Sequence, residues 1–182
     1  MSKITQPQGQ LFVKISSKLE KRYTQTASTD PWEGSPFAWI LAEASRRKGK
    51  IGEELVEEWC TANGLIVTRT GDSEADRIIN GKRVEIKFST LWEHGFYKFQ
   101  QIRDQDYDYI ICLGISPFEI HCWVIPKDVA RQLAPSQHRG KQGKDTAWLT
   151  VDPNSPQPVL GQYGGGLEKA LELIRIISEH TR

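Results

Sequence analysis

The chain lacks several features that would place it in a specialised class of protein. Its 182 residues contain no run of about 18 apolar residues, the length that a membrane-spanning helix needs, so we expect no membrane span. Residues 1–7 contain no apolar signal segment, and Cys60, Cys112 and Cys122 show no Cys-x-x-Cys spacing. We therefore expect a cytoplasmic protein with reduced, buried thiols and with neither a disulfide nor a zinc site.

An excess of charge of one sign is also missing. The chain has 24 basic and 23 acidic residues, whereas a protein that grips nucleic acid over a large face is usually more basic. A protein that binds DNA can still have a net charge near zero if an acidic site offsets its basic flanks. Evidence for a DNA partner must therefore come from the local distribution of charge. A hydrophobic content of 38% fits one soluble globular domain. We expect an N-terminal arm over residues 1–35 and the domain over residues 36–182.

The most informative stretch is a predicted β-hairpin over residues 76–87. Asn80-Gly81 separates two short β-prone runs, and this pair favours a type I′ turn because both centre positions need a positive φ. Glu85 and Lys87 are two apart on the second strand, so they point to the same face. The hairpin brings Asp76 back beside Glu85. Two carboxylates and one ammonium are therefore predicted to converge.

This convergence has a chemical use. Paired carboxylates are hard oxygen ligands that suit Mg²⁺, and a bound Mg²⁺ can activate water and neutralise charge on a phosphoryl oxygen. Lys87 could orient or deprotonate the attacking water, or stabilise the pentavalent phosphorus. The alternative is a surface hairpin with a cross-strand salt bridge, which is common and contributes little stability.

The pattern resembles the PD-(D/E)XK nuclease superfamily over residues 47–125. The matching residues are Asp76, then Glu85, Ile86 and Lys87 on the following strand, with a helix that carries an acid upstream. The resemblance implies an α/β fold with a restriction-endonuclease-like core, in which a central mixed β-sheet is flanked by helices. It also implies a metal-dependent deoxyribonuclease that hydrolyses phosphodiester bonds.

The resemblance further implies a ligand set. Asp76, Glu85 and the main-chain carbonyl of Ile86 would hold Mg²⁺, for which Mn²⁺ can substitute, and Lys87 would act on the water. The residue before Asp76 is Ala75, where the superfamily pattern has proline. That departure leaves the metal ligands untouched.

Two glutamates compete for the role of the helix acid. We predict one helix over residues 36–48, a break at Gly49 and a second helix over residues 51–63. Glycine followed at once by glutamate resembles the family pattern and favours Glu53. The helical wheel favours Glu54, because Glu54 flanks the stripe that it buries: Ile51, Leu55, Trp59 and Ala62. Both glutamates stay candidates.

Other elements follow from periodicity and turn chemistry. We expect helices over residues 11–23, 126–133 and 167–180, strands over 65–69, 107–115 and 118–125, an edge strand over 146–151, and loops over 24–35, 135–145 and 154–166.

Polar residues after the site are candidate DNA contacts. Ser89 and Thr90 extend the strand, His94 lies in the next loop, and a short aromatic and basic segment follows. Glutamine can pair with adenine and arginine with guanine. The candidates in these segments and in the glycine-containing loop 135–145 are Ser89, Thr90, His94, Lys98, Gln100, Gln101, Arg103, His138, Arg139, Lys141, Gln142 and Lys144. The alternatives are core packing for the aromatic segment and a flexible solvated loop for residues 135–145.

The leading hypothesis is an Mg²⁺-dependent DNA endonuclease that is most like a small type II restriction enzyme. A palindromic target in double-stranded DNA would imply a homodimer, and such a system can include a cognate methyltransferase. Alternatives are a structure-specific nuclease for Holliday junctions or repair, and a homing nuclease. A catalytically silent DNA-binding module is an alternative of another class. Mg²⁺-dependent cleavage separates the enzymes from that module.

Overall fold

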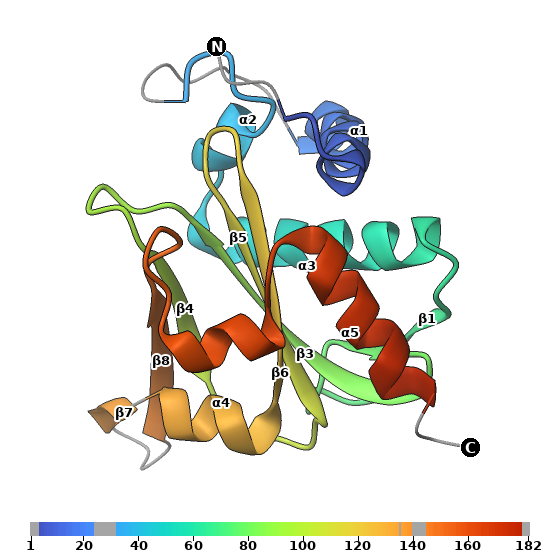
Figure 1. The fold of residues 1–182 in the computed structure, drawn as a ribbon, viewed down its shortest axis with the longest axis vertical. Coiled ribbons are helices and arrows are strands. Elements are labelled where there is room, and N and C mark those ends of the chain that lie inside the picture. Colours follow the sequence, from blue (N-terminus) through green and yellow to red (C-terminus); the bar gives the residue numbers. More distant parts are fainter. Residues whose placement is uncertain (1–3, 24–31, 135, 140–144, 180–182) are drawn as a thin grey trace.

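The computed structural model describes residues 4–23, 32–134, 136–139 and 145–179. Its centre is a six-stranded sheet of order β1-β2-β3-β5-β6-β9 (Figure 1). Its strands are β1 (Val67–Arg69), β2 (Arg77–Ile79), β3 (Lys82–Thr90), β5 (Tyr109–Ile115), β6 (Ile120–Pro126) and β9 (Gly164–Gly165). β3 and β5 are parallel, and the other neighbours are antiparallel. The sheet is therefore mixed and flanked by helices, which confirms the predicted fold class.

A second sheet has three strands in the order β4-β8-β7. They are β4 (Tyr97–Ile102), β8 (Asp145–Val151) and β7 (Ser136–Arg139). Two predictions were wrong here: the strand at 146–151 is the middle strand and not an edge, and part of the expected loop 135–145 is a strand. β8 pairs with β4 some 50 residues earlier in the chain, and local sequence patterns do not register such a distant partner.

The predicted hairpin is present. Asn80 and Gly81 have φ values of 47° and 85°, as a type I′ turn requires. Arg77 lies opposite Val84 in the antiparallel register. One step earlier, the Asp76 N–H donates to the Val84 carbonyl at 3.0 Å. Asp76 therefore enters the sheet next to Glu85.

The helices differ from prediction mainly between residues 36 and 62, and a short 3₁₀ helix, η1 (Pro158–Tyr163), lies in the expected loop over residues 154–166. The α-helices are α1 (Pro7–Tyr23), α2 (Ala38–Leu41), α3 (Ser45–Ala62), α4 (Lys127–Leu133) and α5 (Leu167–Glu179). The expected helix over 36–48 is a single turn, and α3 begins at Ser45 and continues through Gly49 without a break. A helical glycine costs about 1 kcal/mol, and the apolar stripe that α3 buries outweighs that cost. Ala62, which was expected in this stripe, is exposed.

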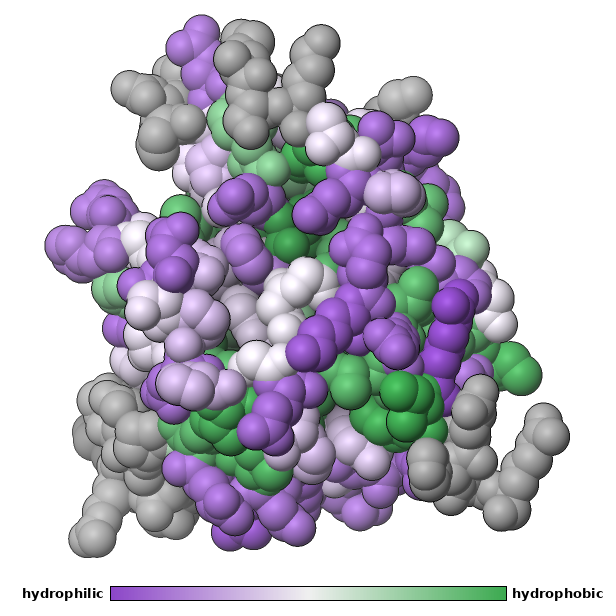
Figure 2. Space-filling model, in the orientation of Figure 1, coloured by the Kyte–Doolittle hydropathy of each residue, from purple (hydrophilic) through white to green (hydrophobic). Residues whose placement is uncertain are grey.

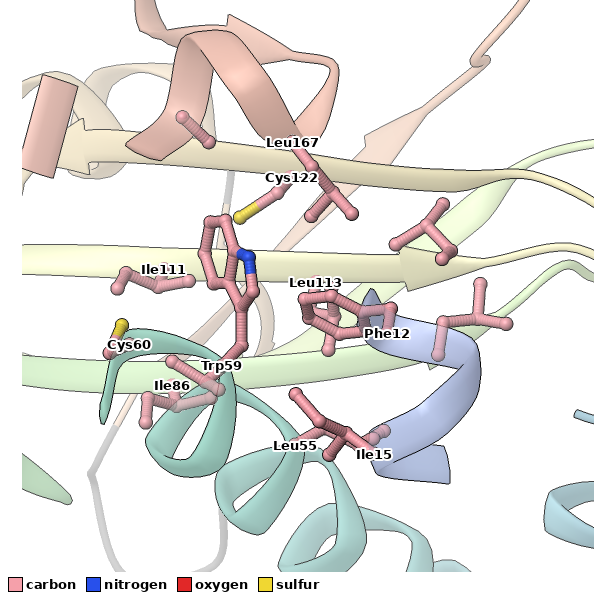
Figure 3. Close-up of a cluster of buried hydrophobic side chains, with 14 of the residues drawn as sticks. Phe12, Ile15, Leu55, Trp59, Cys60, Ile86, Ile111, Leu113, Cys122 and Leu167 are labelled. Atoms are coloured by element: carbon pink, nitrogen blue, oxygen red, sulfur yellow. The ribbon is translucent and has the colours of Figure 1, made fainter. Parts of the chain in front are cut away.

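The core is centred on Trp59 of α3 (Figure 3). Its ring lies 5.3 Å from that of Phe12 in α1, and both side chains are fully buried. Leu167 of α5 and Ile111 of β5 belong to the same cluster. Helices α1, α3 and α5 therefore cover one face of the large sheet, and the segment expected as an arm contributes Phe12 to the core.

The other face of the large sheet packs against the second sheet and α4. Cys112 and Trp123 point to this face and cluster with Phe99 of β4 and Leu149 of β8. On β3 the alternation of side chains buries Val84 and Ile86 against the helices. Glu85 and Lys87 therefore face the second sheet.

The three cysteines are buried, as the sequence predicts. They are Cys60, Cys112 and Cys122, and all three are free. Burial raises the pKa of the Cys60 thiol to about 12, so it stays protonated. Within the described ranges, no helix is long and apolar enough to cross a membrane. The face shown in Figure 2 is mostly hydrophilic, with apolar residues gathered in patches.

Candidate active site

The structure brings Asp76, Glu85 and Lys87 together. Lys87 Nζ lies 2.6 Å from Glu85 Oε1. Asp76 Oδ2 accepts a hydrogen bond of 2.7 Å from the N–H of Ile86. Glu85 is only 6% exposed. The hairpin register thus places two carboxylates and one ammonium at one point, on the side of β3 that faces the second sheet.

Burial and mutual repulsion raise the pKa of two acids here. Desolvation raises the pKa of Glu85, the ammonium of Lys87 opposes this rise, and the charge of Asp76 adds to it. Desolvation also raises the pKa of Glu53, and Asp76 again adds to the rise while Arg77 offsets it. Negative charge is therefore concentrated around Asp76. A bound cation would relieve it.

The structure separates the two candidate helix acids. Glu53 lines the cleft that contains Asp76. Glu54 lies on the side of α3 that faces α1, where its carboxylate contacts Arg22 at 3.0 Å and accepts a hydrogen bond of 2.9 Å from the Tyr23 hydroxyl. Only Glu53 is therefore placed to act with Asp76.

Arg77 is a site residue that the sequence analysis missed. Its guanidinium contacts Glu53 at 3.3 Å and Glu57 at 2.8 Å, and it donates to the main-chain carbonyl of Asp76. The sequence does contain a pattern that predicts this role. Glu53 and Glu57 are four residues apart on one helix face, and a single arginine next to Asp76 can bridge such a pair.

Glu53, Asp76 and Lys87 line an open cleft of about 1090 Å³. Its lining combines acids with basic, aromatic and amide side chains, including Glu53, Asp76, Lys87, Arg46, Lys48, Lys98, Trp92, His94, Phe96, Gln100 and Gln101. Burial lowers the pKa of Lys48. A cleft with acids at one point and cations around it suits an anionic substrate held against a cation site.

The donor set fits a hard cation. Asp76 and Glu85 would supply carboxylate oxygens, and Ile86, which lines the cleft with Asp76, would supply a main-chain carbonyl. In the described part of the chain, no three side chains of His, Cys, Asp or Glu form a ligand cluster. Mg²⁺ commonly takes only one or two carboxylates and completes its shell with water and phosphate oxygens, so this set suits it.

No family model matches this chain, and no curated protein does. Among solved structures, it is similar to a bacterial homing endonuclease, I-Ssp6803I, at 17% sequence identity and a TM-score of 0.49. The match covers 76% of this chain and 99% of that one. It assigns no role to any residue.

Of the predicted DNA contacts, some line the cleft, one lies outside it, and the side chains of the others are outside what the structure describes. Thr90, His94, Lys98, Gln100 and Gln101 line the cleft, and so does Ser89. The Ser89 hydroxyl is engaged with the main chain. It accepts a hydrogen bond of 3.0 Å from the Lys98 N–H and donates one of 2.8 Å to the Thr90 carbonyl.

Arg103 is exposed beyond the end of β4 and is not part of the cleft lining. His138 and Arg139 belong to β7, although their side chains lie outside what the structure describes. Lys141, Gln142 and Lys144 lie outside the described residues. The contacts predicted for the 135–145 segment therefore stay predictions.

Gln101 has an unusual backbone. Its φ is 57°, and the pairing of β4 with β8 shifts register between Phe99 and Ile102. A bulge of this kind re-aims side chains, and a non-glycine residue at positive φ costs of order 1 kcal/mol. The bulge lies where β4 borders the cleft.

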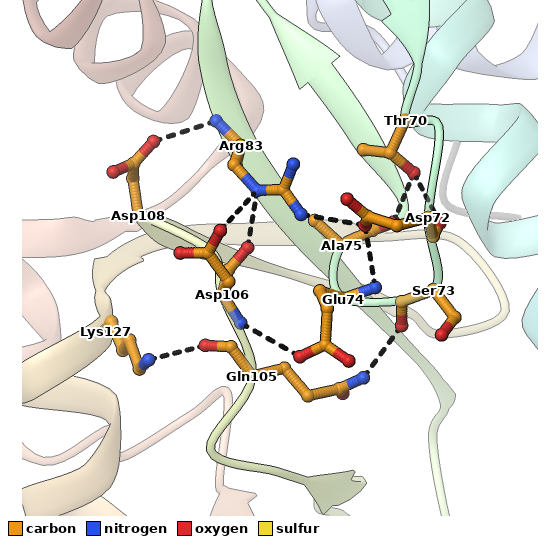
Figure 4. Close-up of polar contacts among 10 residues, drawn as sticks. All are labelled: Thr70, Asp72, Ser73, Glu74, Ala75, Arg83, Gln105, Asp106, Asp108 and Lys127. Atoms are coloured by element: carbon orange, nitrogen blue, oxygen red, sulfur yellow. Dashed lines mark hydrogen bonds and ion pairs between the residues drawn. The ribbon is translucent and has the colours of Figure 1, made fainter.

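A polar network holds the loop that leads into Asp76 (Figure 4). Arg83 of β3 contacts Asp72 at 2.8 Å and donates to the Asp106 carbonyl at 2.6 Å. Thr70 donates to the Ala75 carbonyl at 2.7 Å. The loop is thus tied both to β3 and to the segment before β5, which fixes the position of Asp76.

Proposed function

We propose that this chain is a metal-dependent DNA endonuclease of the PD-(D/E)XK type. The observation that carries the proposal is the convergence of Asp76, Glu85 and Lys87, of which Asp76 and Lys87 line a cleft together with basic side chains. A phosphodiester is anionic, and its hydrolysis needs charge stabilisation and an oriented water. This cleft offers groups for both tasks.

The residues divide the work. Asp76, Glu85 and the carbonyl of Ile86 would hold Mg²⁺, which when bound supplies charge neutralisation and lowers the pKa of a water molecule. Lys87 projects its ammonium from the same face of β3 as Glu85, where it can hydrogen-bond the attacking water or a phosphoryl oxygen. Glu53 approaches from α3 and is held there by Arg77.

The walls of the cleft would hold the DNA. Arg46, Lys48 and Lys98 supply positive charge for the phosphates next to the scissile one. Gln100 and Gln101 present amide groups, which can pair with base edges. Phosphate contacts would fix the register, and base contacts would supply sequence preference.

The finer proposal is a sequence-specific enzyme of the type II restriction kind. It is supported by the small chain and by amide groups in the cleft wall. A palindromic target would then require a homodimer in which each subunit cuts one strand, and a cognate methyltransferase would protect the same site. A homing nuclease built on the same core is the alternative.

One experiment tests the proposal. The full chain is incubated with long unmethylated duplex DNA, with and without Mg²⁺, and with a branched junction in parallel. Discrete Mg²⁺-dependent bands support a sequence-specific endonuclease, and the spacing of the cuts distinguishes a short site from a long, rare one. Cleavage of the junction alone indicates a structure-specific nuclease. Binding without cleavage in any metal contradicts the proposal and favours a silent module.

A further inference from the structure

Trp92 is an exposed aromatic residue in the wall of the cleft. Among the described residues the large apolar side chains left exposed are Ile66, Trp92 and Ile176, and of these only Trp92 lines the cleft. Its side chain is 44% exposed, whereas Trp59 and Trp123 are buried. Aromatic side chains that line a cleft commonly contact the ligand that the cleft binds.

The loop that carries Trp92 has a defined shape. It connects β3 to β4 and projects from the body of the molecule (Figure 1). The Trp92 N–H donates to the Phe96 carbonyl at 3.0 Å, and the Gly95 N–H donates back to the Trp92 carbonyl at 2.9 Å. The Trp92 and Phe96 rings are stacked, with centroids 6.1 Å apart. The indole is therefore held in place at the mouth of the cleft.

A cation is fixed beside this indole. Lys98 Nζ lies 4.5 Å from the centroid of the Trp92 ring and 5.0 Å from that of Trp148. Aromatic rings attract an ammonium through their quadrupole and carry no net charge, so they hold Lys98 without neutralising it. Trp92 and Lys98 line the same cleft, so the exposed part of the indole and the ammonium that lies over its ring are both open to a bound ligand.

We propose that Trp92 and Lys98 form a nucleotide-binding element, in which Trp92 stacks on a base that is unstacked from the duplex and Lys98 binds the adjoining phosphate. This inference rests on the proposed DNA endonuclease function and specifies its substrate. Every base has a π-face, and aromatic side chains stack on such faces without sequence preference. Within an intact duplex the neighbouring bases cover these faces, and apolar wedges insert only where bases unstack.

Two duplexes of equal length and sequence test the inference, one fully paired and one with a single extrahelical 2-aminopurine. Binding is measured for the full chain with Ca²⁺ in place of Mg²⁺, so that the DNA is not consumed. The variants are Trp92→Leu, which keeps an apolar side chain, and Trp92→Phe, which keeps a ring. Thermal unfolding of each variant verifies its fold.

We expect the wild-type protein and Trp92→Phe to prefer the bulged duplex and to quench 2-aminopurine fluorescence. Trp92→Leu should bind the bulged duplex about tenfold more weakly, in line with the loss of one stacked base, and should leave the fluorescence bright. Lys98→Gln should weaken both complexes and reduce the slope of log K against log salt by about one phosphate contact.

The outcomes separate this inference from the function on which it rests. If the wild-type protein binds the paired duplex but Trp92→Leu matches it on the bulged one, the stacking role is wrong and the nuclease proposal stands. If Trp92→Phe is as weak as Trp92→Leu, the ring is not stacking and the inference also fails. If the wild-type protein binds neither duplex, both fail.

Discussion

Arg77 donates a hydrogen bond of 2.7 Å from Nη1 to the main-chain carbonyl of Asp76. The same guanidinium contacts Glu53 Oε2 at 3.3 Å and donates from Nε to Glu57 Oε2 at 2.8 Å. Arg77 is 6% exposed, so little water is available to replace these contacts. It therefore fixes the position of the helix acid relative to the hairpin acid.

Replacing Arg77 by lysine tests this positioning role. Lysine keeps the charge but cannot serve three acceptors with a planar fork. We expect the free energy of unfolding to fall by about 1–3 kcal/mol and cleavage to fall by at least about tenfold. Urea unfolding and initial cleavage rates measure the two effects. Arg22→Lys is the control because Arg22 is an exposed partner of Glu54, and its effect on stability should stay within about 0.5 kcal/mol. Normal cleavage by Arg77→Lys would contradict the role.

The central site is tested by Asp76→Asn and Lys87→Ala. Asparagine can still accept the hydrogen bond from the Ile86 N–H but lacks the charge that a cation site needs. Each variant should lose cleavage by at least about a hundredfold and keep its fold and most of its DNA affinity. The assays are cleavage in Mg²⁺ and binding in Ca²⁺. Full activity in either variant would show that the site is assigned to the wrong residues.

Glu53 and Glu54 give a matched pair of neighbouring acids. Glu53→Gln should lower the cleavage rate about tenfold or more, because Glu53 lies in the cleft near Asp76. Glu54→Gln removes only contacts with Arg22, Lys50 and Tyr23 on the other side of α3, so cleavage should stay close to wild type. Single-turnover rates compare them. Equal losses would mean that the helix acid acts only through the stability of α3.

Two glycines of α3 give a second matched pair. A Cβ on Gly52 would lie 2.3 Å from the Cβ of Phe88, so Gly52→Ala must push α3 away from β3. We expect a loss of about 1–3 kcal/mol of stability. A Cβ on Gly49 meets nothing within 4 Å, so Gly49→Ala should stabilise by up to about 1 kcal/mol through helix propensity alone. Thermal unfolding measures both, and a stable Gly52→Ala would contradict the close packing.

The acids predict a pH dependence of Mg²⁺ binding. The pKa of Glu85 is raised above its ordinary value of 4.5, chiefly by burial. Between 4.5 and the raised pKa of the folded protein, the metal-free folded protein binds more protons at Glu85 than the unfolded chain does, so the contribution of Glu85 to stability falls as pH rises through this range. A metal needs the deprotonated carboxylate. The increase in Tm caused by Mg²⁺ should thus be larger at about pH 8 than at about pH 5.

The control for this pH dependence is Asp76→Asn, which should show little increase in Tm at either pH. An increase in the wild-type protein that does not change with pH would mean that Mg²⁺ binds away from Glu85.

Local sequence patterns correctly predicted the elements that are determined by residues close together in the chain. The Asn80-Gly81 turn determines the hairpin register, and the register alone places Asp76 beside Glu85. The paired strands β5 and β6 and the helix α5 also agree with their apolar patterns.

Features that depend on distant packing were not predictable in this way. Gly49 suggested a break, but α3 continues through it because the apolar stripe beyond it packs on the sheet. β8 lies in the middle of its sheet because β4 pairs with it from far upstream. The helical wheel favours Glu54, but a wheel cannot say which side of α3 meets the hairpin, and Glu53 is the acid that lines the cleft.

The cleft is built from two sheets that contribute different parts. Asp76 lies just before β2 and Glu85 and Lys87 lie on β3 of the large sheet, with Glu53 on α3, whereas β4 of the small sheet carries Lys98, Gln100 and Gln101. If this chain is the nuclease we propose, substitutions on β4 should change which DNA is accepted without moving the groups proposed to break the bond. Target preference can therefore diverge under selection while hydrolysis is conserved, and β4 is the place to begin retargeting such an enzyme.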